Sequence, residues 1–89
     1  MNAKFKIGQL MITAGALQKI SPAEVRKSVD RHISGDWGEV CEEDGKLNDW
    51  AVENAERILS SYRAEKGERF WVITEADRSA TTILLPSEY

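Results

Sequence analysis

The chain has 89 residues, of which 42% are hydrophobic and 30% are charged, and its formal net charge is −3. This composition is typical of a soluble globular protein rather than a disordered one, and the length predicts a single domain over residues 1–89. The lone cysteine, Cys41, excludes an internal disulfide and a cysteine-cluster zinc site. No run approaches the roughly 20 apolar residues of a membrane helix, so we expect no membrane contact and a cytoplasmic location.

Apolar runs and the turns between them predict most of the secondary-structure elements. A first strand is expected over residues 5–13, an ordered loop over 35–45 and a weaker helix over 46–56. Three further strands, separated by turns at 65–68 and 76–80, are expected over residues 57–64, 69–75 and 81–85. Most of the large core volume is expected from five aromatic residues: Trp37, Trp50, Tyr62, Phe70 and Trp71.

The clearest local signal, between the first strand and the loop, starts a helix. Residues 21–24, Ser-Pro-Ala-Glu, combine an N-cap serine, a proline at the first helical position and a glutamate placed for a capping box. Apolar side chains then recur at every fourth position, at Val25, Val29 and Ile33. We therefore predict a helix over residues 22–34. The resulting order, β-α-α-β-β-β, predicts an α+β fold: a small antiparallel sheet of about four strands with helices packed on one face.

Residues 36–53 form an acidic segment, with seven acidic side chains against one lysine and a net charge of −6. Glu43, Asp44 and Asn48 offer oxygen ligands of the kind that magnesium and calcium accept, but their spacing matches no EF-hand loop. We interpret the acids as solvated residues before a helix, whose positive end favours them. We expect no metal and no cofactor. The basic residues are scattered, so nucleic acid is not expected as a direct ligand.

His32, the single histidine, precedes Asp36 by four residues and Trp37 by five. Two interpretations stay open. A histidine oriented by a nearby aspartate is a general base. A histidine in the last turn of a helix also complements the helix dipole without any chemical role.

Glu75, Asp77 and Arg78 lie together in the last predicted turn. With Arg57 they form either an ion-pair network that tightens the sheet or a surface that binds a phosphate or a partner protein. The structural interpretation would require a buried pair, either Arg57 with Asp77 or Asp36 with Arg78.

Two longer motifs resemble a known group of proteins. Residues 35–44 are Gly-Asp-Trp-Gly-Glu-Val-Cys-Glu-Glu-Asp, followed by Asn48, and residues 71–89 are Trp-Val-Ile-Thr-Glu-Ala-Asp-Arg-Ser-Ala-Thr-Thr-Ile-Leu-Leu-Pro-Ser-Glu-Tyr. Both resemble a widespread family of small bacterial proteins of plasmids, phages and other mobile elements, labelled "plasmid-related protein" or type I restriction enzyme subunit. The second label does not fit, because 89 residues cannot hold a methyltransferase domain. The resemblance implies relatives on mobile elements but no particular reaction.

We therefore expect a small soluble bacterial protein that is a non-enzymatic accessory or regulatory factor of a mobile element and acts by binding another protein. One alternative is a small hydrolase of a nucleotide or phosphodiester that uses His32, Glu43, Asn48 and Arg78. The other is a purely structural polar network. The candidate functional surface requires the loop after the first helix to meet the final turn, and it comprises His32, Asp36, Trp37, Glu43, Asp44, Asn48, Arg57, Glu75, Asp77 and Arg78.

Overall fold

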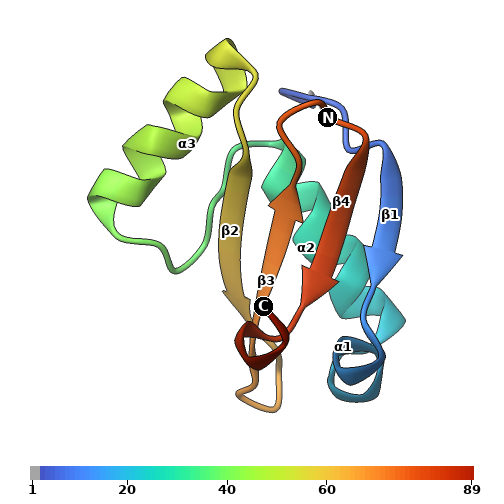
Figure 1. Ribbon diagram of the computed structural model, residues 1–89. Coiled ribbons are helices and arrows are strands. Elements are labelled where there is room, and N and C mark those ends of the chain that lie inside the picture. Colours follow the sequence, from blue (N-terminus) through green and yellow to red (C-terminus); the bar gives the residue numbers. More distant parts are fainter. Residues whose placement is uncertain (1–2) are drawn as a thin grey trace.

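The computed structural model describes residues 3–89 and has a four-stranded sheet with three α-helices around it (Figure 1). The elements follow in the order β1 (Gln9–Ile12), α1 (Ala14–Lys19), α2 (Pro22–Ile33), α3 (Glu42–Asn54), β2 (Ile58–Arg63), β3 (Arg69–Thr74), β4 (Ala80–Leu84) and a final 3-10 turn, η1 (Pro86–Glu88). The predicted α+β class and the four strands are confirmed. Among residues 3–89, no helix combines the length and the apolar character needed to span a bilayer.

The sheet has the strand order β1-β4-β3-β2 and is mixed rather than wholly antiparallel. The last three strands form the expected antiparallel meander, with β3 in the centre. The first strand, β1, is instead parallel to β4, with Gln9 opposite Ala80 and Ile12 opposite Ile83. Hairpin turns set the direction of the meander strands, whereas no turn joins β1 to β4. Local sequence therefore did not determine the direction of β1.

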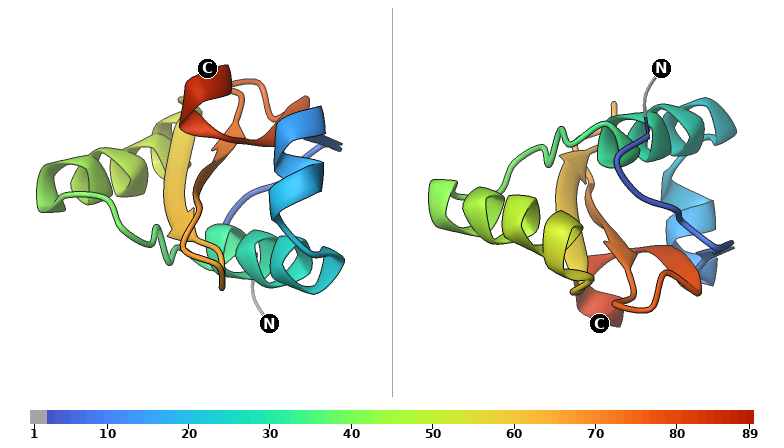
Figure 2. Two further views of the ribbon diagram at one scale, coloured as in Figure 1. Left: turned by 90° about the horizontal axis from the view of Figure 1, so that it is seen from below. Right: turned by 90° about the horizontal axis from the view of Figure 1, so that it is seen from above.

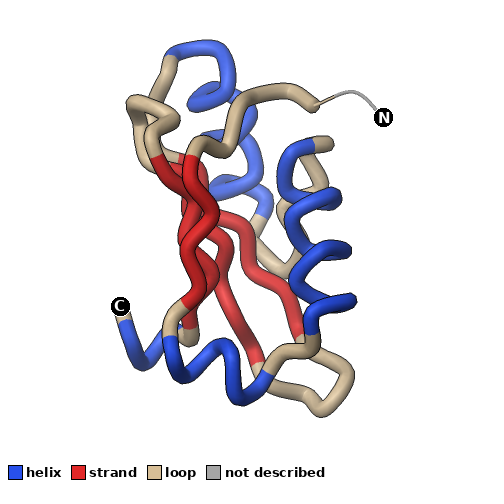
Figure 3. The backbone as a smooth tube through the Cα atoms, turned by 90° about the vertical axis from the view of Figure 1, so that its right-hand side faces the viewer, coloured by secondary structure: helices blue, strands red, loops and turns tan. Residues whose placement is uncertain are grey.

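The helices do not all cover one face, which corrects the second part of the fold prediction. Helix α2 packs along one face of the sheet, and the final turn η1 lies on the opposite face (Figures 1 and 3). Helix α3 lies beside the edge strand β2 and projects away from the sheet (Figure 2). The sheet therefore has one covered face and one face that only the C-terminal residues partly cover.

The predicted helix over 22–34 is confirmed as α2. Its capping box is complete, with the Glu24 amide donating to Ser21 Oγ at 3.2 Å and the Ser21 amide donating to Glu24 Oε1 at 3.0 Å. Val25 is buried and Val29 packs beside it in the larger core cluster, against Tyr62 and Phe70 of the sheet. Local capping and an apolar stripe together explain why this prediction succeeded.

Three boundaries differ from the predictions. The first strand is shorter, because it covers only Gln9–Ile12. The expected break after it is helix α1, in which Thr13 Oγ1 accepts from the Ala16 amide as an N-cap. Helix α3 starts at Glu42 and so takes up the end of the expected loop; three acids fill its first turn, where the helix dipole favours them.

A second, smaller core cluster joins α3 to the sheet. Trp37, Ala51 and Ile58 form it, with Phe5 packed against them. Trp50, however, is 53% exposed and does not belong to the core as expected. Asn48 and Ala51 are the buried residues of α3, so the neighbouring positions 47 and 50 point elsewhere on the helix.

Candidate functional site

The Asp36-Trp37-Gly38 turn is held tightly against the end of α2. Asp36 forms a two-pronged ion pair with Arg31, with Nε to Oδ2 at 2.7 Å and Nη2 to Oδ1 at 3.2 Å. This arginine, above all, lowers the pKa of Asp36 below its ordinary value. The Asp36 backbone carbonyl accepts from the Tyr62 hydroxyl at 2.6 Å. Asp36 therefore orients the turn and makes no contact with His32.

This turn closes the outer edge of β2. The Ser61 amide donates to the Trp37 carbonyl at 3.0 Å, and the Glu39 amide donates to the Ser61 carbonyl at 2.6 Å. Gly38 lies between them with φ of +73°, and a Cβ atom at this position would collide with the Ser61 carbonyl oxygen. Only glycine allows this approach. The Gly-Asp-Trp-Gly motif and the glutamate that follows it thus supply two backbone hydrogen bonds to an edge strand.

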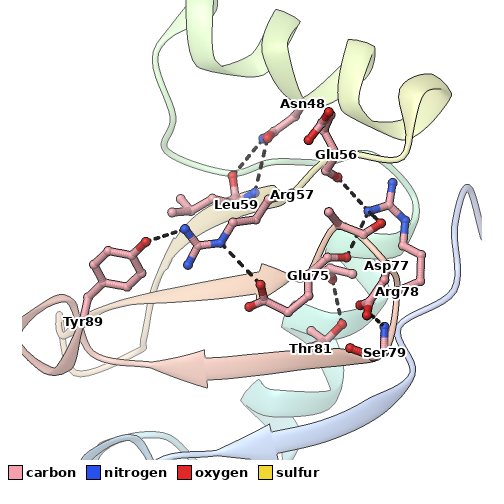
Figure 4. Close-up of polar contacts among 12 residues, drawn as sticks. Asn48, Glu56, Arg57, Leu59, Glu75, Asp77, Arg78, Ser79, Thr81 and Tyr89 are labelled. Atoms are coloured by element: carbon pink, nitrogen blue, oxygen red, sulfur yellow. Dashed lines mark hydrogen bonds and ion pairs between the residues drawn. The ribbon is translucent and has the colours of Figure 1, made fainter.

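Asn48 completes the same closure from α3. Its side-chain Nδ2 donates to the Leu59 carbonyl at 2.8 Å, and its Oδ1 accepts from the Leu59 amide at 3.3 Å (Figure 4). The side-chain amide therefore occupies the place that a neighbouring strand would take. The outward groups of both Leu59 and Ser61 are satisfied, although β2 is the last strand of the sheet.

Trp37 and His32 lie inside the protein, behind this edge. Trp37 is buried, and its Nε1 donates to Asp49 Oδ1 at 3.0 Å. The His32 side chain is 0% exposed and both ring nitrogens are engaged, Nδ1 with Ser60 Oγ at 2.6 Å and Nε2 with Thr74 Oγ1 at 2.9 Å. No face of this imidazole is open to a substrate.

The hydroxyl chain that continues from His32 assigns its tautomer. Thr81 Oγ1 donates to the Ile7 carbonyl at 2.8 Å, so it must accept from Thr74 Oγ1, 2.7 Å away. Thr74 has then used its single proton and accepts from His32 Nε2. The ring therefore carries a proton on Nε2. Burial, followed by the positive charge of Arg78, lowers the pKa of His32 to about 4, so the ring is neutral at pH 7 and Nδ1 accepts from Ser60.

Arg78 binds backbone carbonyls rather than acids. Its guanidinium donates to the Glu56 carbonyl at 2.7 Å and to the Ala51 carbonyl at 3.0 Å, and it also reaches the carbonyl of Glu75 at 3.2 Å (Figure 4). These contacts join the C-terminal end of α3 to the β3–β4 turn. The Ala51 carbonyl also accepts from the Ala55 and Glu56 amides, so Arg78 adds a further donor to the carbonyl that ends the helix.

The other charged candidates, Arg57, Glu75 and Asp77, do not share one network. Arg57 pairs loosely with Glu75, with Nε and Oε1 3.9 Å apart, and donates to the Tyr89 hydroxyl. Asp77 Oδ1 accepts from the Ser79 amide at 2.9 Å within the turn (Figure 4). The expected pairs of Arg57 with Asp77 and of Asp36 with Arg78 do not form, because backbone groups and Arg31 take these partners.

The two distant segments do meet, as the candidate surface required, but they meet inside the protein. The ring of Phe5 joins them: its centroid is 5.1 Å from that of His32 and 6.2 Å from that of Trp37, and the Arg78 guanidinium carbon lies 5.5 Å from it. The only sequence signal for Phe5 was its position at the start of an apolar run, which does not indicate a contact with His32 or Arg78.

Glu43 and Asp44 stand apart from the rest, in the exposed first turn of α3. Across residues 3–89, no group of three or more His, Cys, Asp or Glu side chains is arranged to hold a metal ion. The acids share α3 with two residues that the candidate set missed, Leu47 and Trp50, which are 62% and 53% exposed. The two side chains lie three residues apart, on one side of the helix. The sequence predicted this side to be the buried one, whereas the structure buries Asn48 and Ala51 instead.

Comparisons of the chain with models of protein families, with curated proteins and with solved structures find no match.

Proposed function

We propose that this protein is a non-enzymatic accessory protein that binds a basic partner protein through the exposed face of α3. The observation that carries the proposal is the pair Leu47 and Trp50, two large apolar side chains exposed side by side on one helix. They line a shallow hollow together with Glu43 and Lys46. Tryptophan is prominent among the residues that dominate protein–protein binding energies, because it buries a large area with few rotatable bonds.

The charge around this pair indicates the kind of partner. Helix α3 carries five acidic residues and one lysine, and the lysine is paired with Glu42 at 3.5 Å. Glu43 lies beside the apolar pair, and all five acids of α3 are solvent-exposed. Their negative charge steers a positively charged surface toward the helix and repels acidic ligands, including nucleic acid. A partner with an apolar centre and basic rim would complement it.

Binding accounts for the site better than hydrolysis of a nucleotide or phosphodiester. A general base must reach the proton that it abstracts, directly or through one water. His32 and Asn48 are buried with their polar atoms engaged, and Arg78 donates to backbone carbonyls. Their contacts instead support the structural interpretation of the polar set, and α3 offers the exposed surface.

The biological setting is inferred from the resemblance of the motifs at residues 35–48 and 71–89. We place the protein in the bacterial cytoplasm, as the product of a plasmid, phage or other mobile element. A basic partner in that setting would be a protein of the host or of the element itself.

A comparative capture experiment tests this function. The wild-type chain, Trp50→Ala and Leu17→Ala are immobilised separately and exposed to the same bacterial lysate. Leu17 is the matched control, because it is 63% exposed but lies on α1. Proteins retained by the wild type and by Leu17→Ala, but lost with Trp50→Ala, are then purified and titrated against each variant.

The expected result is a basic protein whose dissociation constant rises about tenfold or more with Trp50→Ala, the change of roughly 1.4 kcal/mol or more typical of a central aromatic residue. Its affinity should also fall as salt is added, because the acids of α3 are exposed. Retention of the same proteins by all three chains, or a partner indifferent to Trp50, would exclude α3 as the binding surface.

A further inference from the structure

Strand β1 leaves one edge of the sheet open. In the parallel pairing with β4, the Gln9 amide donates to the Ser79 carbonyl and the Thr13 amide donates to the Ile83 carbonyl. Alternate residues of a parallel strand face the same neighbour, so the backbone groups of Leu10 and Ile12 point outward. No hydrogen bond joins these outward groups to another segment of residues 3–89. The outer side of β1 is free in Figure 1.

This open edge lacks the usual protection. Residues 9–13 are Gln-Leu-Met-Ile-Thr, with no charge and no proline. Leu10 and Met11 are 40% and 49% exposed. Natural edge strands normally carry charges, prolines or bulges that discourage a further strand from pairing. An apolar, unprotected edge is a template for such pairing.

A groove of about 430 Å³ runs beside the edge, between β1 and α2. Its lining is mostly apolar and includes Leu10, Ile12, Ile20 and Val25. An added strand would place alternate side chains on this face of the sheet, toward the groove, while its backbone paired with Leu10 and Ile12. The occupant that fits is therefore a strand with apolar side chains at alternate positions.

The rim of the groove identifies that strand more closely. Arg26 and Asp30 of α2 both line the groove and lie one helical turn apart. In a two-fold symmetric dimer, the two α2 helices run in opposite directions. Arg26 of one copy would therefore face Asp30 of the other. Strand β1 has the apolar alternation that the groove requires, at Leu10 and Ile12. Rim and strand are thus both self-complementary.

We propose that two copies of this protein associate through antiparallel pairing of their β1 strands, which forms a continuous eight-stranded sheet. The axis passes beside Met11, so that Leu10 of each copy exchanges backbone hydrogen bonds with Ile12 of the other. Met11 then faces Met11 of the second copy on the opposite side of the sheet. Two symmetric Arg26–Asp30 pairs flank the α2 side.

Sedimentation equilibrium of the full chain tests the pairing over roughly 5–500 µM, the range expected for a small interface. The wild type is expected to form a reversible dimer. Met11→Lys places two lysines opposite each other and should raise the dissociation constant at least about fivefold. Leu47→Lys, on the exposed face of α3, is the matched control and should leave the dimer unchanged.

Charge reversal gives a readout that misfolding cannot imitate. Arg26→Asp and Asp30→Arg should each weaken self-association, since each puts like charges together across the axis. Mixing the two variants should produce a mixed dimer, detected by native mass spectrometry, because its charges are complementary again. Circular dichroism establishes that each variant is folded.

Three outcomes would overturn the proposal. The first is a wild-type chain that is monomeric throughout the range. The second is a dimer that tolerates Met11→Lys, or that is lost with Leu47→Lys, which would place the contact elsewhere. The third is a monomer whose NMR signals at residues 10–13 shift only when an apolar strand peptide of another sequence is added, which would assign the edge to a different protein. None of these outcomes bears on binding by Trp50, which lies on α3.

Discussion

At the β2 edge of the sheet, four outward backbone groups of Leu59 and Ser61 are satisfied by the chain itself, whereas at the β1 edge those of Leu10 and Ile12 face outward without partners in residues 3–89. The closed edge uses Trp37, Glu39 and Asn48, which lie in or beside the most distinctive motif of the sequence. The open edge is part of a plain apolar run. Polar residues in a conspicuous motif can therefore serve to close the edge of a sheet, while a strand with no distinctive motif has the unpaired edge.

Replacing Gly38 should produce the largest effect, because it removes the turn that closes β2. Gly38→Ala forces a non-glycine residue to φ of +73° and drives its Cβ into the Ser61 carbonyl. We expect a loss of about 3 kcal/mol or more in the free energy of unfolding, measured by urea denaturation.

Gly67→Ala is the matched control for this change. Gly67 has φ of +94°, but no atom lies within 4 Å of the added Cβ. It should cost only the backbone strain, about 1–2 kcal/mol. Equal losses in both variants would mean that the contact of Gly38 with Ser61 does not hold the edge closed.

The pH dependence of the free energy of unfolding should report on the burial of His32 behind the β2 edge. The pKa of His32 is lowered to about 4 in the folded protein, against about 6.5 in the unfolded chain. As the pH falls below about 6.5 the unfolded state gains a proton that the folded state does not, so stability decreases until about pH 4. Between pH 7.5 and pH 5 we expect a loss of about 2 kcal/mol.

This interval is informative because His32 is the single histidine. The pKa of Asp36 is lowered by Arg31, so its stabilising effect is retained at these pH values and is lost only at more acid pH. His32→Gln should be less stable overall but should show only a slight slope near pH 5, because the pKa values of Glu24, Glu39 and Glu88 are also lowered in the folded protein. A wild-type chain with constant stability over this interval would show that the imidazole is protonated without penalty, and hence is hydrated.

The parts of the fold predicted from sequence are those that local contacts determine. Helix α2 followed from its capping box, and the meander from its turns. The side of the sheet on which β1 pairs, its parallel direction and the place of α3 beside β2 depend on contacts between distant segments. Periodicity alone could not reveal them.

For the candidate site, the sequence identified most of the residues but not their partners. His32, Asp36, Trp37, Asn48 and Arg78 were singled out as polar or aromatic residues in motifs, and they do form specific contacts. Their partners, however, are mostly backbone groups and hydroxyls, which have no sequence signature. The exposure of Trp50 was missed because a tryptophan in a helix is expected in the core, whereas α3 buries Asn48 and Ala51.

Removing the second closure of β2 should have a smaller effect than replacing Gly38, and it tests the comparison of the two edges most directly. Asn48→Ala deletes both hydrogen bonds to Leu59 but leaves the backbone of α3 in place. The partly buried amide and carbonyl of Leu59 then lose their partners, so we expect a loss of about 1.5 kcal/mol in the free energy of unfolding. Asn54→Ala, an exposed asparagine of the same helix, should change stability by less than about 0.5 kcal/mol. Amide hydrogen exchange at Leu59 should accelerate toward the rate at Leu10 in dilute protein; unchanged protection at Leu59 would mean that Asn48 is not what closes this edge.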